Sequence, residues 1–208
     1  PTTAACPDFA YWPTASSPAV AKLQAAGALC LGKLNMDQFA NGLVGMRGPM
    51  PCRNAFSEAH IPGGSSSGSA VAVAAHMVDF ALGTDTGGSG RVPAALNNVV
   101  GLKQSVGLVS NAGSVPVNRT LDCINPYALN CGDALEVLNT IRGYDPQSYF
   151  SRPVADAVTL EHPPIQRFRF AVPQASQLEF FNDALAEAQY HQALARLEAM
   201  GGQRVEID

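Results

Sequence analysis

Short apolar segments alternate along this chain with loops rich in glycine and proline, and this pattern predicts short helices and strands. Residues 18–26 predict a helix. Ser17 can cap its first turn, Pro18 suits the first helical position, and Gly27 can end it. The apolar residues 28–32 that follow predict a short buried strand.

The middle of the chain predicts a helix, a strand, a turn and a second helix in direct succession. Residues 68–77 are small and apolar all round, as in a helix packed tightly inside a domain. Residues 78–83 then predict a strand, and the turn after it leads into a short helix over 92–97. This order places the turn at the amino terminus of a helix, where free N–H groups and the helix dipole favour negative charge.

The last third of the chain predicts two further helices, over 133–141 and over 182–200. Between them, residues 167–171 alternate polar and apolar side chains as a strand does. Strands alternating with helices predict an α/β fold in which a mixed sheet lies between helices. With 208 residues, 47% of them hydrophobic, residues 1–208 have the size of one domain or of most of a larger one.

Charge and composition exclude several classes of function. A net charge of −4 without a basic run argues against a nucleic-acid partner, because phosphate binding needs clustered lysine and arginine. Five cysteines at irregular spacings, without CxxC pairs, indicate neither a disulfide framework nor a zinc site. No apolar stretch approaches the length of a membrane span, and no signal peptide is visible. We therefore expect a cytoplasmic protein that needs no metal or other cofactor, with a homodimer left open.

Two serine-bearing turns carry the candidate chemistry. The first serine turn, residues 63–69, reads GGSSSGS, and the second serine turn, residues 83–91, reads GTDTGGSGR. Glycines on both sides of a hydroxyl let the backbone approach a substrate and aim successive N–H groups at one point, as a developing oxyanion requires. One such turn alone is more often a loop or a helix start than an active site. Two of them, with Ser65 and Ser89 standing 24 residues apart, favour an active site.

Both turns belong to a longer pattern. Residues 62–68 (PGGSSSG) and 84–94 (TDTGGSGRVPA) resemble the signature of the amidase-signature hydrolases. Further family motifs follow in the expected order, namely PTTAACP at 1–7, GKLNMDQF at 32–39, VVGLK at 99–103 and LDC at 121–123. The resemblance covers most of residues 1–145. Within the family, residues 38–45 and the neighbourhood of the LDC motif are most similar to allophanate hydrolases.

The resemblance implies a catalytic role for one serine of each turn. Ser89 would attack the amide carbonyl, and Ser65, which follows a cis peptide bond in the family, would relay the proton to a lysine. Other residues of the pattern would hold the oxyanion, line the acyl pocket or support the serines. They are Thr86, Gly87, Gly88 and Ser89 for the oxyanion hole, Ala40 and Asn41 for the substrate, and Ser66, Asp85 and Arg91 for support.

The supporting residues also have structural interpretations. Ser66 can cap a helix, and Arg91 can either bind an anionic substrate or clamp the loop through its five donors. Asp85 could orient a histidine in a Ser-His-Asp triad, but none of the four histidines lies in a motif. We expect the motif residues Asp122 and Cys123 to have packing roles.

The general base is the main departure from the family. A serine hydroxyl needs a neighbour that removes its proton, and the resemblance places that lysine upstream of Pro1. The lysines of this chain, Lys22, Lys33 and Lys103, do not match its position. Such a lysine must have its pKa lowered from about 10.4 by burial. We therefore expect Ser89 to be nearly inert in these residues alone.

The resemblance implies a C–N hydrolase that cleaves a linear amide by a Ser-Ser-Lys mechanism on a small-molecule substrate. The small residues Ala40 and Asn41 suit a short substrate such as allophanate, which would be converted to ammonia and carbon dioxide in urea degradation. Two other activities of the family remain open, the glutaminase subunit of a transfer-RNA amidotransferase and a broad acylamidase. The missing base leaves a further alternative, an inactive fragment that serves as a structural module.

Overall fold

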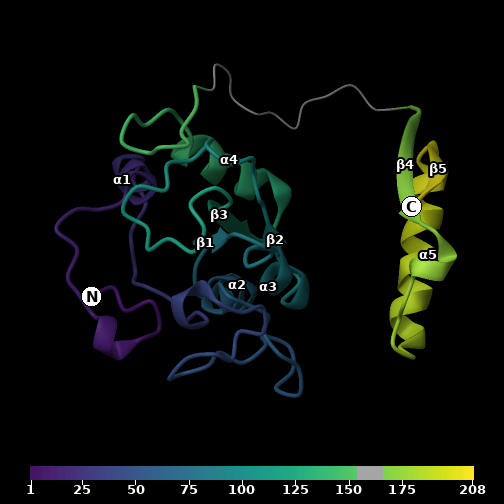
Figure 1. Cartoon of the computed structure of the whole chain (residues 1–208), viewed down its shortest axis with the longest axis horizontal. Coiled ribbons are helices and arrows are strands. Elements are labelled where there is room, and N and C mark those ends of the chain that lie inside the picture. The colour runs from purple at the N-terminus through teal and green to yellow at the C-terminus, as the bar shows by residue number, and fades with distance from the viewer. Residues whose placement is uncertain (154–165) are drawn as a thin grey trace. The chain divides into compact units, whose positions relative to one another are not determined.

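The computed structural model describes residues 1–153 and 166–208 of the chain (Figure 1). Its contacts divide the chain into two compact units, Pro1–Leu160 and Glu161–Asp208. The first unit contains both serine turns and all the residues that the sequence assigns to the site. No helix of the described ranges is long and apolar enough to cross a membrane.

A three-stranded sheet in the order β1-β3-β2 forms the centre of the first unit. Both outer strands pair antiparallel with β3, and Asp85 at the end of β1 lies opposite Cys123 at the start of β3. The strands are β1 (Phe80–Asp85), β2 (Val100–Gly101) and β3 (Cys123–Ala128). The helices are α1 (Pro18–Ala25), α2 (Ser67–Ala74), α3 (Arg91–Leu96) and α4 (Cys131–Ile141), with short 3₁₀ turns η1 (Pro7–Phe9) and η2 (Gln38–Ala40).

Helices pack on both faces of this sheet. On one face, Leu82 and Ile124 contact the apolar side of α4, which also packs against α1. On the other face, Ala81 and Tyr127 pack against α2 and α3, and Figure 1 shows these two helices across the sheet from α4. Neighbouring residues divide this way because successive side chains of a strand point to opposite faces.

Local signals explain where the helices begin and end. Asn130 caps α4, since its side chain accepts a hydrogen bond of 2.9 Å from the Asp133 N–H. At the other end of α4, the Lys22 ammonium donates to the Arg142 carbonyl at 2.6 Å, where a positive charge complements the helix dipole. The small side chains of α2 allow Ala70 and Val73 to be fully buried against the sheet.

The second unit contains two parallel strands joined through a helix. Asp183 caps the helix by accepting hydrogen bonds from the N–H groups of Leu185 and Ala186. Its elements are β4 (Phe168–Pro173), η3 (Ala175–Gln177), α5 (Ala184–Ala199) and β5 (Gly202–Ile207).

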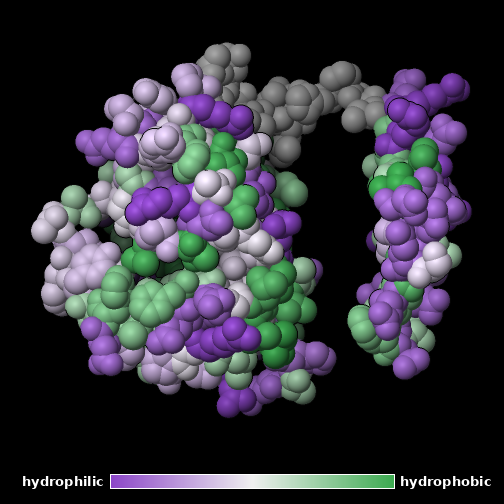
Figure 2. All heavy atoms as spheres, viewed as in Figure 1, coloured by the Kyte–Doolittle hydropathy of each residue, from purple (hydrophilic) through white to green (hydrophobic). Residues whose placement is uncertain are grey.

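The predicted helices all form near their predicted bounds, as do the strands predicted at 78–83 and 167–171. The buried strand predicted at 28–32 is wrong. Leu29 and Leu31 are 86% and 75% exposed, and this segment pairs with no described strand. Its apolar run resembles a buried strand, but no described element covers it. Figure 2 shows apolar side chains at the surface of this unit.

The α/β organisation predicted from the sequence is confirmed. Strand β3 was not predicted, and it supplies the middle of the sheet. That the sheet of a whole domain lies between helices, and that residues 1–208 form a single partial domain, stay predictions.

Candidate active site

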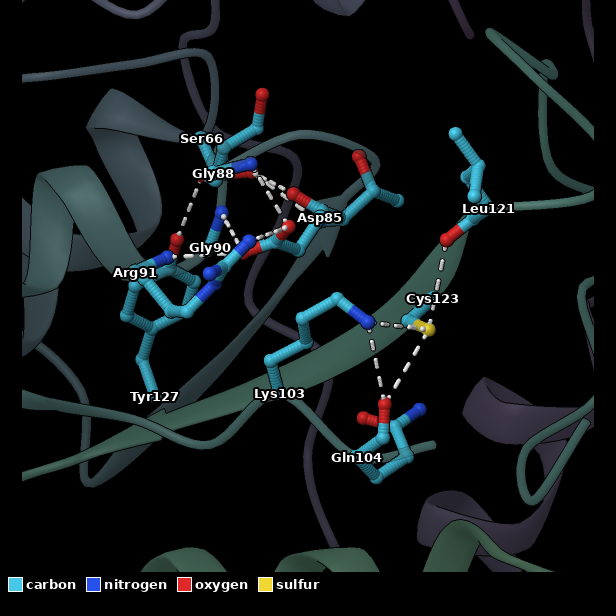
Figure 3. A network of polar contacts seen from close by, with 12 residues as sticks. Ser66, Asp85, Gly88, Gly90, Arg91, Lys103, Gln104, Leu121, Cys123 and Tyr127 are labelled. Atoms are coloured by element: carbon cyan, nitrogen blue, oxygen red, sulfur yellow. Dashed lines mark hydrogen bonds and ion pairs between the residues drawn. The ribbon is translucent and has the colours of Figure 1, made fainter. Parts of the chain in front are cut away.

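The second serine turn leaves the end of β1 and enters α3. Asp85, the last residue of β1, is fully buried and receives three backbone N–H groups of this turn. Its Oδ1 accepts from Gly88 at 2.9 Å, and its Oδ2 accepts from Gly90 at 3.0 Å and from Arg91 at 3.1 Å (Figure 3). The carboxylate therefore fixes the course of the backbone on both sides of Ser89.

The Arg91 side chain binds the same carboxylate. Its Nε donates to Oδ2 of Asp85 at 3.0 Å and its Nη2 donates to Oδ1 at 3.1 Å. Burial alone would raise the pKa of Asp85, but the hydrogen bonds from the Arg91 side chain and from the three N–H groups outweigh it and lower that pKa. Of the two interpretations of Arg91, the geometry supports the loop clamp. The hydrogen-bond partners of Asp85 in the described residues include no histidine.

The first serine turn packs directly against the second. The Ser66 N–H donates to the Ser89 carbonyl at 3.3 Å. The Ser66 hydroxyl accepts from the Thr84 N–H and donates to the Thr84 carbonyl, both at 3.1 Å, so it connects the first serine turn to β1. Ser66 therefore has a structural role next to the candidate nucleophile.

Ser65 carries a fully buried hydroxyl. The peptide bond between Gly64 and Ser65 is cis, as the resemblance implies. Ser65 is fully buried, its carbonyl accepts from the Asp37 N–H at 2.9 Å, and its Oγ has no hydrogen-bond partner among the described residues. An unpaired buried hydroxyl is unusual, because burying a polar group without a partner costs free energy.

Asp37, which directly precedes η2, contacts the Ser65 carbonyl and also holds the loop after η2. Asp37 is fully buried, and its carboxylate accepts from the N–H groups of Gly45 at 2.9 Å and Arg47 at 2.7 Å. This arrangement closes the loop that contains Ala40 and Asn41. In the described part of the chain, neither of these two residues forms a hydrogen bond with Ser65 or Ser89, so their assignment to a substrate pocket stays a prediction.

Strand β3 contributes two site residues that the sequence analysis did not identify. Tyr127 is fully buried and its hydroxyl donates to the Ser89 carbonyl at 3.1 Å. Asn125 is also fully buried and lies against Gly90. Their spacing of two residues, which places both on one face of a strand, was the only signal in the sequence, and Pro126 between them concealed it.

Some N–H groups of the second serine turn remain open. The N–H of Gly88 is held by Asp85, whereas those of Thr86, Gly87 and Ser89 have no hydrogen-bond partner in the described ranges. The Thr86 hydroxyl donates to Asp122, whose carboxylate also accepts from the N–H groups of Val117 and Asn118. Asp122 therefore connects the second serine turn to residues 117–118 through hydrogen bonds, a structural role that differs from the packing role predicted from the sequence.

None of the three lysines forms a hydrogen bond with either candidate catalytic serine in the described residues. Lys22 binds the end of α4, Lys33 donates to the Thr2 hydroxyl, and the Lys103 Nζ lies 3.3 Å from the Cys123 Sγ (Figure 3). Burial raises the pKa of the Cys123 thiol, although Lys103 opposes this effect. The described residues contain no cluster of three or more His, Cys, Asp or Glu side chains that could hold a metal.

Comparison with protein families matches the family described as Amidase over residues 1–208. The chain belongs to the amidase family. It is 44% identical over 212 residues to the urea amidolyase of Lachancea kluyveri, a match that covers 100% of this chain and 11% of that protein.

Solved structures that resemble this chain include further amidase-family enzymes. The Kluyveromyces lactis allophanate hydrolase is 41% identical with a TM-score of 0.89, over 100% of this chain and 34% of that one. A glutamyl-tRNA(Gln) amidotransferase subunit from Thermotoga maritima is 35% identical with a TM-score of 0.89, over 99% of this chain and 46% of that one. The chain therefore spans less than half the length of each of these relatives.

Proposed function

We propose that this chain carries the nucleophile and the proton-relaying serine of an amidase that cleaves a linear amide, with allophanate as the substrate. One observation carries the proposal. The two serine turns are joined by the Ser66 N–H to Ser89 carbonyl hydrogen bond of 3.3 Å, and beside this contact the buried Ser65 hydroxyl has no partner in the described residues. A hydroxyl held in this way is available to exchange protons with a neighbour.

In this mechanism the Ser89 Oγ attacks the amide carbonyl carbon and forms a tetrahedral intermediate. The open N–H groups of Thr86, Gly87 and Ser89 stabilise its oxyanion, while Gly88 stays bound to Asp85. One such donor contributes about 3–4 kcal/mol of transition-state stabilisation in related chemistry.

Ser65 takes the proton of the Ser89 hydroxyl and passes it to a lysine supplied by polypeptide outside these residues, as the family resemblance implies. The relay returns the proton to the leaving nitrogen, the C–N bond breaks and ammonia leaves. Water then hydrolyses the acyl ester on Ser89, with the relay removing its proton, and Ser89 regains its hydroxyl.

The substrate is proposed from the relatives. Similarity to a urea amidolyase and to an allophanate hydrolase over 100% of this chain favours allophanate. A second candidate is the side-chain amide of glutamine, which is supported by the equal TM-score of 0.89 with the Thermotoga maritima amidotransferase.

The test uses the intact polypeptide that contains these residues and measures ammonia released from allophanate, glutamine and a fatty amide. Ser89→Ala and Ser65→Ala should each reduce kcat by about 10³-fold or more, since the members of such a unit act together. Ser69→Ala is the matched control, because Ser69 is a buried serine of α2 whose hydroxyl donates to the Leu82 carbonyl at 2.8 Å. It should lose some stability and keep its activity.

The outcomes separate the candidates. Undiminished ammonia release by Ser89→Ala would overturn the mechanism. Preference for glutamine or a fatty amide would overturn allophanate as substrate, and a folded wild-type protein that cleaves none of the three amides would favour the structural module.

A further inference from the structure

The peptide unit between Ser89 and Gly90 is held from both sides. Its carbonyl accepts from the Ser66 N–H at 3.3 Å and from the Tyr127 hydroxyl at 3.1 Å. Its N–H donates to Oδ2 of Asp85 at 3.0 Å. The orientation of this peptide plane decides how the backbone of Ser89 presents the candidate nucleophile, and the shorter of the two bonds to its carbonyl comes from a side chain.

The Tyr127 ring has a fixed position. It is fully buried on β3 and packs among Ala70, Val73 and Ala94. The neighbouring strand approaches so closely that a Cβ on Gly83 would lie 2.7 Å from the Cε2 of the ring. These contacts fix the position of the phenol oxygen within hydrogen-bond distance of the Ser89 carbonyl.

We propose that Tyr127 is a positioning residue for the nucleophile, acting through the hydrogen bond from its hydroxyl to the Ser89 carbonyl. This inference rests on the proposed function of Ser89. Burial raises the pKa of Tyr127, so the phenol remains a donor at neutral pH. Without the phenol, only the longer Ser66 contact holds this carbonyl, and the main chain of Ser89 loses the shorter of its two carbonyl contacts.

The expected effect falls on the chemical step. A displacement of the order of 1 Å at a reacting group can cost about 10²-fold in rate, and the loss of a hydrogen bond to the main chain of the same residue should cost this much or less. We expect Tyr127→Phe to lower kcat about 10- to 100-fold while KM changes less than about 2-fold. The substitution removes one oxygen atom and keeps the ring that packs against α2 and α3.

The experiment compares Tyr127→Phe with Tyr190→Phe in the intact polypeptide. Tyr190 is the matched control, because its hydroxyl is also buried and has no partner among the described residues, and it lies in the second unit. The measurements are kcat, KM, the melting temperature and the rate at which a fluorophosphonate labels Ser89. Tyr127→Phe should lower kcat and slow the labelling by a similar factor, whereas Tyr190→Phe should match the wild type in both.

A merely structural role would lower the melting temperature of Tyr127→Phe and leave its kcat and labelling rate unchanged, and that result overturns the inference. Ser89→Ala is measured alongside. If it keeps its activity, the proposed function fails, whereas an inactive Ser89→Ala with a fully active Tyr127→Phe removes the role of Tyr127 alone.

If the Tyr127→Phe variant does not fold, two non-natural residues at position 127 test the same hydrogen bond. 4-Fluorophenylalanine at position 127 fills the space of the hydroxyl without donating, and 4-aminophenylalanine restores an N–H donor there. The amino form should recover most of the kcat and labelling rate that the fluoro form loses. Equal rates for the two forms would also overturn the inference.

Discussion

Asp85→Asn replaces the buried carboxylate of the second serine turn by an amide of the same shape. The carboxylate accepts five hydrogen bonds, two on Oδ1 and three on Oδ2, from Gly88, Gly90 and Arg91. An amide has only one acceptor oxygen. In its better orientation, the oxygen replaces Oδ2 and the NH₂ group faces the Gly88 N–H and the Arg91 guanidinium.

The loss of stability follows from these contacts. The Gly88 N–H would be left without an acceptor in a buried site, which costs about 1–3 kcal/mol. The bonds from the Gly90 and Arg91 N–H groups would change from charge-assisted to neutral, at about 1 kcal/mol each. The Arg91 side chain is 55% exposed, so water can replace its lost bond and it adds little. The sum predicts that the free energy of unfolding falls by about 3–5 kcal/mol.

Urea unfolding followed by circular dichroism measures this difference, with Asp79→Asn as the matched control. Asp79 lies on the surface just before β1, and the same substitution there should change stability by less than about 0.5 kcal/mol. A difference between wild type and Asp85→Asn of less than about 1 kcal/mol would refute the reasoning.

The pH dependence gives a second check. Because folding lowers the pKa of Asp85, its ionised form stabilises the fold at every pH above its unfolded value of about 3.9, and this contribution is lost as the pH falls through the lower folded pKa. The stability difference between wild type and Asp85→Asn should therefore be constant near neutral pH and shrink in acid below about pH 4. A difference that widens in acid would contradict the assignment.

Two further predictions test the packing around the site. In Gly90→Ala, the new Cβ would lie 2.5 Å from the Oδ1 of buried Asn125, so we expect a loss of about 1–3 kcal/mol in urea unfolding, whereas Gly87→Ala has no heavy atom within 4 Å and should be nearly neutral. Equal stability of the two variants would contradict this packing. Iodoacetamide should modify exposed Cys30 long before Cys123, because burial shields the Cys123 thiol and raises its pKa. Early alkylation of Cys123 in mass spectra would show that β3 opens.

Local signals in the sequence predict much of this fold. Pro18 at the start of α1 and the small apolar residues of 68–77 in α2 each act within one helix, so neighbouring positions suffice to recognise them. The Ser17 side chain, expected to cap α1, forms no capping hydrogen bond. Strand β3 was missed because Asn125 and Pro126 disfavour a strand. These residues are tolerated because β1 and β2 hold the strand on both sides, a condition that only the folded chain reveals.

In the candidate site too, the residues that local patterns mark could be predicted from the sequence, whereas those placed by distant contacts could not. Ser65 and Ser89 were identified because glycine-rich turns place hydroxyls next to free N–H groups, which is a property of a short segment. The contacts of Tyr127 with Ser89, and of Asp37 with the Ser65 carbonyl, join residues 38 and 28 positions apart in the sequence. No local pattern indicates such partners, since they follow from the antiparallel pairing of β1 with β3 and from the closure of the loop after η2.

The exposed segment around Leu29 and Leu31 has a consequence for handling the protein. Its backbone is not paired with any strand of the described chain, and its two leucines present apolar surface to solvent. Unpaired backbone next to exposed apolar side chains can associate with other molecules. We therefore expect a lysine at position 29 or 31 to make a polypeptide of these 208 residues more soluble, because it replaces exposed apolar surface by a charge.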